Sequence, residues 1–220
     1  IRSRLAHLAS HSGSVNRQVI SFMSYGNSEG KSFISSNLAA CFSQMRLPCL
    51  LIDFDLRRGA LTKQMGLTSA PGMCAHLDTG VALDDIMVKN VRPNLDFIPA
   101  GAWSTSITEH FSNERFREIM EVLKPRYQYI VIDTAPMVVA HESLAIAQDS
   151  DFAVFVSTVW KTRKEYVMQA IEEIRNVRSS RIHVILNRTK QIDDNLVSNY
   201  YYMTRTKKRK GFVPKPVLET

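Results

Sequence analysis

The chain has 220 residues, a formal net charge of +7 and an apolar fraction of 45%, which suits one large α/β domain better than two small ones. A chain of this length buries a sizeable core without disulfides, and its three cysteines lack metal-type spacing, so we expect free thiols in a reducing compartment. No apolar run is long enough to span a bilayer, no signal peptide is present, and the moderate charge does not by itself indicate a nucleic-acid partner.

Apolar runs and amphipathic segments alternate along the chain. The apolar runs are continuous, which is typical of strands buried on both faces of a parallel sheet, and they predict strands over 18–24, 48–55, 95–101, 129–136, 151–158 and 181–188. Helical spacing of apolar residues predicts helices over 32–45, 114–127 and 165–177. We therefore predict an α/β fold, a mostly parallel sheet with helices on both faces, whose ligands bind beyond the carboxyl ends of the strands.

The composition changes near residue 190. The segment that follows has little apolar periodicity, a tyrosine triplet at Tyr200, Tyr201 and Tyr202, and the basic run "TRTKKRK". We predict a folded domain over 1–189 and a flexible basic tail over 190–220. Such a basic run is more often a solvated segment than a nucleic-acid site, so we expect no nucleic-acid partner.

The segment "SYGNSEGKS", residues 24–32, joins the first strand to the first helix. The unpaired N–H groups and the dipole of a helix start favour an anion there. In a phosphate-binding loop Lys31 would reach the β- and γ-phosphates and the Ser32 hydroxyl would coordinate Mg²⁺. The usual pattern, G-x-x-x-x-G-K-[ST], has glycine where this chain has Tyr25. The nucleotide is expected to contact Asn27, Ser28, Glu29, Gly30, Lys31, Ser32 and Phe33.

Charged and amide side chains end three other strands. Asp53 and Asp55 alternate at the end of the second strand, with Arg57 two positions later. Two such carboxylates repel unless a cation or a proton separates them, so Mg²⁺ binding and acceptance of a hydroxyl proton both stay open. Asp133 ends "YIVIDTAP" in the Walker B form and would hold Mg²⁺. Asn187 ends the last strand, either as a turn residue or as a contact to a purine edge.

Together these motifs resemble the cytoplasmic kinase domain of bacterial tyrosine kinases, which partner polysaccharide chain-length regulators. The resemblance runs from residue 1 to about 190, and its most specific part is "LLIDFDLRRG", the Walker A′ box of the family. It implies a P-loop NTPase architecture like that of partitioning ATPases. The catalytic residues that it implies are Lys31, Asp53, Asp55 and Arg57, with Asp53 activating the tyrosine hydroxyl and Ser32, Asp55 and Asp133 at the metal.

The resemblance also implies an activity and partners. The chain is expected to be an ATP-dependent protein-tyrosine kinase that uses Mg²⁺ and phosphorylates Tyr200, Tyr201 and Tyr202 of a neighbouring subunit. It would thereby regulate the polymerisation and export of exopolysaccharide or capsule. The implied partners are a homo-oligomeric ring, a membrane chain-length regulator upstream on the same chain or separate, and a protein-tyrosine phosphatase. We expect a fragment or processed form, since the chain begins at Ile1, at the cytoplasmic face of the inner membrane.

Two other functions stay open at this point. A partitioning-type ATPase switch would carry an early lysine in K-G-G-x-G-K, but Tyr25, Gly26 and Asn27 supply none. A nucleotide-binding scaffold that has lost catalysis is disfavoured by the intact trio of aspartates.

Overall fold

The computed structural model describes most of the chain up to residue 189. The chain divides into two units, Ile1–Asn187 and Arg188–Thr220, and the fold below is that of the first. The predicted tail, with its tyrosine triplet, lies outside the described residues. Those residues are 17–68, 70–103, 111–140, 142–177 and 181–189.

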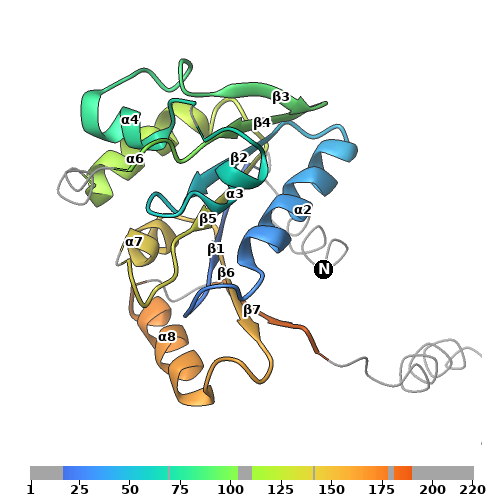
Figure 1. Ribbon diagram of the computed structural model, residues 1–220, viewed down its shortest axis with the longest axis vertical. Helices are drawn as coiled ribbons and strands as arrows, with labels where there is room; N and C mark the ends of the chain where they lie inside the picture. Colours follow the sequence, from blue (N-terminus) through green and yellow to red (C-terminus); the bar gives the residue numbers. More distant parts are fainter. Residues whose placement is uncertain (1–16, 69, 104–110, 141, 178–180, 190–220) are drawn as a thin grey trace, which may run out of the picture. The chain divides into compact units, whose positions relative to one another are not determined.

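Seven strands of the described residues form one sheet in the order β3-β4-β2-β5-β1-β6-β7 (Figure 1). All pairings are parallel except that of β3 with β4, at one edge. Every residue of the four central strands β2, β5, β1 and β6 is buried, which explains why their sequences are mostly apolar. The strands are β1 (Gln18–Met23), β2 (Cys49–Phe54), β3 (Val88–Arg92), β4 (Leu95–Ile98), β5 (Tyr129–Thr134), β6 (Phe152–Thr158) and β7 (Ile182–Asn187).

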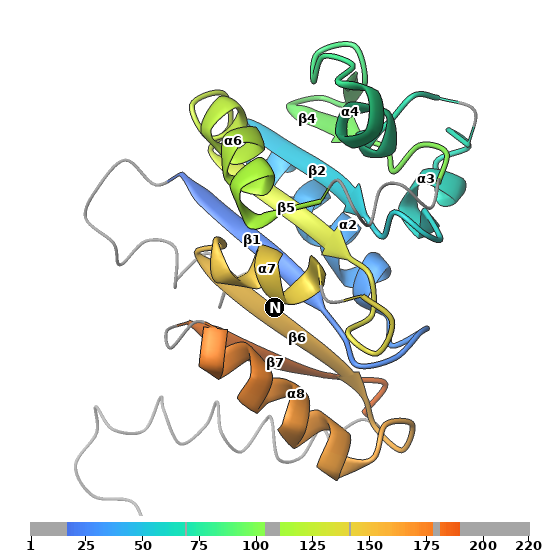
Figure 2. The same ribbon diagram turned by 90° about the vertical axis from the view of Figure 1, so that its left-hand side faces the viewer.

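Helices cover both faces of the sheet (Figure 2). Apolar residues of α2 and α3 join one core cluster, those of α4 and α6 a second on the other face, and α7 and α8 pack over β1 and β6. The helices are α2 (Lys31–Gln44), α3 (Ala60–Gln64), α4 (Met73–Thr79), α6 (Asn113–Leu123), α7 (Glu142–Gln148) and α8 (Lys164–Val177). No helix among the described residues combines the length and the apolar character that a bilayer crossing needs.

The predicted fold class is confirmed, and so are the six predicted strands and three predicted helices. Four short elements were not predicted. The strand β3, "VKNVR", is polar and half exposed, so it carries no buried-strand signal. The helices α3, α4 and α7 have five to seven residues, which is too short for a 3.6-residue period to stand out.

Candidate active site

The loop between β1 and α2 shapes a pocket at the carboxyl edge of the sheet. Ser28 has φ 57° and Gly30 has φ 92°, so the loop twice takes the left-handed conformation before α2 begins. No side chain of the residues that the structure describes caps the start of α2, so its first N–H groups are available to a ligand. A pocket of about 200 Å³ is lined by residues 26–33 of the loop together with Ser24, Asp55, Arg58, Ala60 and Pro136. The structure thus brings all seven predicted loop residues to one pocket.

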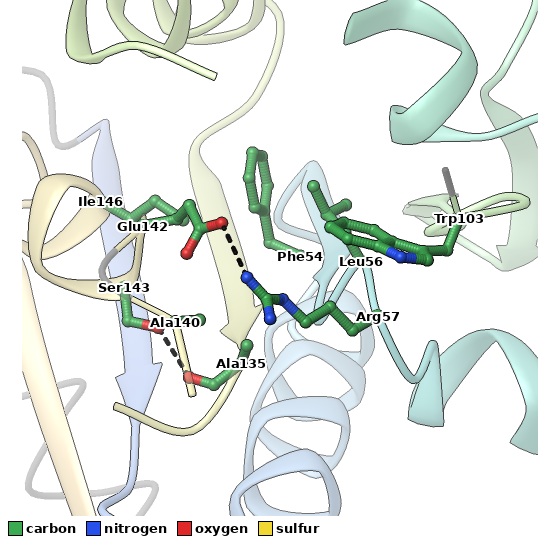
Figure 3. A pocket seen from close by; sticks show the side chains of 9 residues that line it. All are labelled: Phe54, Leu56, Arg57, Trp103, Ala135, Ala140, Glu142, Ser143 and Ile146. Atoms are coloured by element: carbon green, nitrogen blue, oxygen red, sulfur yellow. Dashed lines mark hydrogen bonds and ion pairs between the residues drawn. The ribbon is translucent and has the colours of Figure 1, made fainter. Parts of the chain in front are cut away.

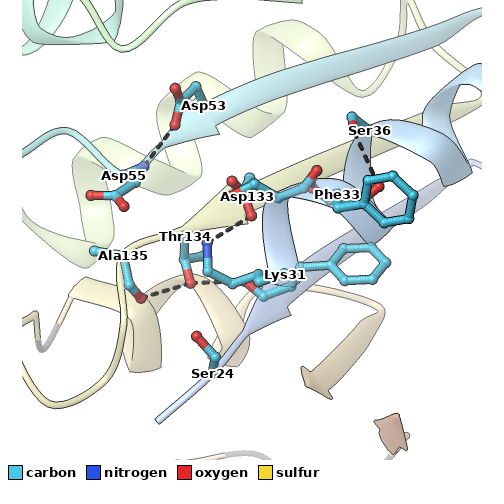
Figure 4. A network of polar contacts seen from close by, with 12 residues as sticks. Ser24, Lys31, Phe33, Ser36, Asp53, Asp55, Asp133, Thr134 and Ala135 are labelled. Carbon is cyan, nitrogen blue, oxygen red and sulfur yellow. Dashed lines mark hydrogen bonds and ion pairs between the residues drawn. The ribbon is translucent and has the colours of Figure 1, made fainter. Parts of the chain in front are cut away.

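Lys31 lies at the floor of this pocket in a buried ion pair. Its Nζ donates to Oδ1 of Asp133 at 2.7 Å (Figure 4), and the two side chains are 6% and 0% exposed. The other carboxylate oxygen of Asp133, Oδ2, is buried and has no hydrogen-bond partner among the described residues. Such an oxygen is costly to bury unpaired, so this geometry favours a further positive ligand at Asp133.

The two aspartates of the A′ segment have different surroundings. Asp55 is 5% exposed and lines the pocket, and burial raises its pKa despite the nearby charge of Lys31. Asp53 is fully buried and does not line the pocket. Its Oδ2 accepts hydrogen bonds from the backbone N–H and the hydroxyl of Thr62, both at 2.8 Å, and its Oδ1 accepts from the N–H of Asp55. Burial first, and then the charge of Asp133, raise the pKa of Asp53 to about 7.

Arg57 points away from the phosphate loop. Its guanidinium lies 3.7 Å from Glu142 and 5.2 Å from the ring centre of Trp103, in a small apolar hollow beside α7 (Figure 3). The neighbouring Arg58, which the sequence reasoning passed over, lines the phosphate pocket instead. The pair "RR" is visible in the sequence, but only the backbone turn after Asp55 decides which arginine faces the pocket.

Asn187 lies behind the loop at the end of β7. Its Nδ2 donates to the carbonyl of Glu29 at 2.8 Å, and a Cβ added to Gly30 would lie 2.1 Å from that nitrogen. Glycine is therefore required at position 30 both for φ and for space. A contact of Asn187 with a purine stays a prediction.

The residues present fit a magnesium ion bound with a nucleotide. Among the described residues no three carboxylate, imidazole or thiol groups are close enough to hold a metal by themselves. Magnesium in phosphate sites takes one or two protein oxygens and completes its shell with phosphate and water. The unpaired Oδ2 of Asp133, the carboxylate of Asp55 and the hydroxyl of Ser32 are oxygen donors of that kind.

Comparison with known proteins agrees with this geometry. The sequence profile of an AAA domain family, AAA_31, matches residues 17–191. The solved kinase domain of VpsO is 33% identical, with a TM-score of 0.75 over 85% of this chain and 92% of that domain. The chain belongs to the bacterial tyrosine kinase family. The tyrosine-protein kinase CpsD of Streptococcus agalactiae is 28% identical over 200 residues, 90% of this chain and 87% of CpsD.

Other members of the family are much longer. The chain spans 21% of the putative tyrosine-protein kinase EpsB of Ralstonia solanacearum, at 27% identity over 158 residues. A plasmid partition protein from Borrelia burgdorferi shares the fold at 22% identity and a TM-score of 0.64. The predicted P-loop architecture, like that of partitioning ATPases, is thereby confirmed, and the family implies that the phosphate loop binds a nucleotide.

Proposed function

We propose that this domain transfers the γ-phosphoryl group of ATP to tyrosine hydroxyls, including those of Tyr200, Tyr201 and Tyr202 in a neighbouring subunit. The observation that carries the proposal is the buried pair of Lys31 and Asp133 beside a phosphate loop, in a pocket that Lys31 and the Asp55 carboxylate both line. Kinship with the VpsO kinase domain supports transfer rather than simple hydrolysis.

The residues divide the chemistry between them. The N–H groups at the start of α2 and the ammonium of Lys31 bind the phosphates and offset their charge. Ser32, Asp55 and Asp133 would hold Mg²⁺, which supplies further neutralisation of the phosphate charge when bound. Arg58 lies in the pocket as a second cation. Because phosphoryl transfer depends mostly on positioning and charge neutralisation, this set of groups is suited to it.

The proton of the tyrosine hydroxyl passes to an aspartate of the A′ segment. A carboxyl whose pKa is about 7, as burial makes that of Asp53, is well matched to proton acceptance at neutral pH. In this structure Thr62 encloses Asp53, so the role requires α3 to separate from the carboxylate when tyrosine enters. Asp55 already faces the pocket and is the alternative acceptor.

The proposed setting follows the family resemblance. The domain acts at the cytoplasmic face of the inner membrane, in a homo-oligomeric ring beside a membrane chain-length regulator, and a phosphatase reverses its phosphorylation. Each phosphate adds a charge near −2. Phosphates on the tyrosine triplet would therefore partly neutralise the adjacent run "TRTKKRK" and loosen the ring, which regulates polysaccharide polymerisation and export.

Phosphosite mapping tests the proposal. The full chain is incubated with Mg·ATP and analysed by mass spectrometry, alongside Lys31→Met and Asp55→Asn. We expect phosphotyrosine in the tail of the unmodified chain and at least about a hundredfold less in both variants, since removal of one charge-stabilising group typically costs that much. Steady ATP hydrolysis without tyrosine labelling would replace the proposal with a partitioning-type switch. Binding of Mg·ATP with neither hydrolysis nor tyrosine labelling would indicate a nucleotide-binding scaffold without catalysis.

A mixing experiment tests transfer between subunits. One partner is Lys31→Met with an intact tail, and the other is active but carries phenylalanine in place of the three tail tyrosines. Transfer between subunits predicts label on the Lys31→Met chain only in the mixture. Label that never appears there would restrict the reaction to a chain's own tail.

A further inference from the structure

Glu29 is a buried acid inside a loop that is built for anions. Its side chain is 1% exposed and it stands two residues before Lys31. A carboxylate that faced the phosphates would repel them, and a buried carboxylate is tolerated only where donors satisfy it. The chemistry described above gives Glu29 no role.

The donors that satisfy Glu29 come from the end of β6 and the loop that follows. The backbone N–H of Thr158 donates to Oε2 at 2.5 Å, and the hydroxyl of Thr162 donates to Oε1. In the same loop Nζ of Lys161 donates to the carbonyl of Asn27. We call residues 158–162 the brace loop.

A second set of contacts fixes the backbone of the phosphate loop from the same side. The carbonyl of Glu29 accepts from the hydroxyl of Thr158 at 3.0 Å and from Nδ2 of Asn187 at 2.8 Å. The carbonyls of Asn27 and Glu29 therefore both face β6 and β7. Loop carbonyls that turned toward the ligand would repel phosphate, so their direction matters for binding.

The planarity of the peptide bond links these carbonyls to the ligand side. In a trans peptide the C=O and the following N–H point in opposite directions. Since the carbonyls of Asn27 and Glu29 face β6 and β7, the N–H groups of Ser28 and Gly30 face the other way. That side holds β5 and β2, from whose ends Asp55 and Pro136 line the pocket.

We propose that Glu29 is a positioning residue: its carboxylate binds the brace loop and thereby holds the N–H groups of the phosphate loop toward the nucleotide. Glu29 does not touch the phosphates. The inference rests on the proposed function for the identity of the ligand, but the coupling of the two loops exists without it. Part of the ordering of the phosphate loop is thus present before the nucleotide binds, which strengthens binding.

Two measurements on the full chain test the coupling. The first is the affinity for Mg·AMPPNP by titration calorimetry. The second is the fluorescence anisotropy of Trp160, which lies in the brace loop and is 94% exposed, measured without nucleotide in a Trp103→Phe background because the chain has two tryptophans. The variants are Glu29→Ala, Thr162→Val, their combination, and the near-isosteric Glu29→Gln.

Thr162→Val, which loses one charge-assisted hydrogen bond, should weaken Mg·AMPPNP binding about tenfold and lower the Trp160 anisotropy. Glu29→Ala, which loses two, should weaken binding at least as much and also lower the anisotropy. The double variant should bind within about twofold of the weaker single variant, since both changes break the same contact. Glu29→Gln should bind within about threefold of the unmodified chain, because its amide accepts from the N–H of Thr158 and donates to the hydroxyl of Thr162.

Glu118→Ala, which removes an exposed glutamate on α6, is the control and should change neither measurement. Additive effects in the double variant, or full affinity in Glu29→Ala, would overturn the inference. An unmodified chain that binds no Mg·AMPPNP would refute the proposed function instead. The coupling would then be judged on anisotropy alone, and an unchanged value in Glu29→Ala would overturn it.

Discussion

Replacing Lys31 by methionine should destabilise the protein even without nucleotide. The substitution removes the 2.7 Å partner of Asp133 Oδ1, and Oδ2 already has no hydrogen-bond partner within the described part of the chain. The fully buried carboxylate of Asp133 would then lack a compensating charge. We expect this to lower the free energy of unfolding by about 4 kcal/mol, the middle of the range of about 3–5 kcal/mol that is typical of a broken buried ion pair.

Urea unfolding followed by circular dichroism, in Mg²⁺-free and nucleotide-free buffer, measures this free energy. Adding Asp133→Asn to Lys31→Met should recover at least about 2 kcal/mol, since the double variant no longer leaves a buried charge uncompensated at position 133. Lys63→Met, at an exposed lysine of α3, is the matched control and should stay within about 0.5 kcal/mol of the unmodified chain. If Lys31→Met is as stable as that control, the buried pair does not hold the fold, and our account of the pocket floor is wrong.

Three further outcomes follow from the same structure. Gly30→Ala should destabilise the protein more than Gly66→Ala. Both glycines have positive φ, which costs alanine about 1 kcal/mol, but of the two only Gly30 lies where an added Cβ would collide with another group, the side-chain amide at the end of β7. Equal melting temperatures of the two variants would contradict this. Burial and neighbouring charge raise the pKa of Asp53 to about 7, so its ionisation opposes folding, and the free energy of unfolding in Mg²⁺-free buffer should fall by about 4 kcal/mol as pH rises from about 4 to about 8. Asp53→Asn should lose that slope, and equal slopes in the two proteins would refute the assignment. Burial raises the pKa of the Cys74 thiol to about 12, so a thiol reagent at neutral pH should label the partly exposed Cys41 first and Cys74 only on unfolding; simultaneous labelling would show that the core opens.

The fold, and the residues on the ligand side of the phosphate pocket, could be predicted from the sequence. Continuous apolar runs predict buried parallel strands, and charged residues at their ends predict where a ligand binds. That reasoning brings Lys31, Asp55 and Asp133 to one edge of the sheet, where the structure has them. It fails to separate Asp53 from Asp55, because the two differ through Thr62, a residue of a helix too short to show a helical period.

The hydrogen bonds that hold the phosphate loop from the side of β6 and β7 could not be predicted from the sequence, for a different reason. Glu29 was predicted to contact the nucleotide as a residue of the phosphate loop, and Asn187 because its amide could bind a purine edge. Those contacts stay predictions, whereas the hydrogen bonds that both residues make in holding the loop were not predicted. Which way a loop side chain points depends on donors that are distant in sequence: Thr158 is 129 residues from Glu29, and Asn187 is 158 residues from it. No spacing rule spans such separations, since the contacts exist only once β6 and β7 have joined the sheet.

The order of the strands explains how the phosphate loop can direct its N–H groups toward the ligand and its carbonyls away from it. The phosphate loop follows β1, which lies between β5 and β6. The carboxylates and the ion pair come from the ends of β2 and β5 on one side, and the donors that hold the loop carbonyls come from β6 and β7 on the other. An anion site needs its N–H groups and cations on the ligand side and its carbonyls turned away. A loop on a central strand has partners on both sides for these two tasks, whereas a loop at a sheet edge would leave one set of groups to water.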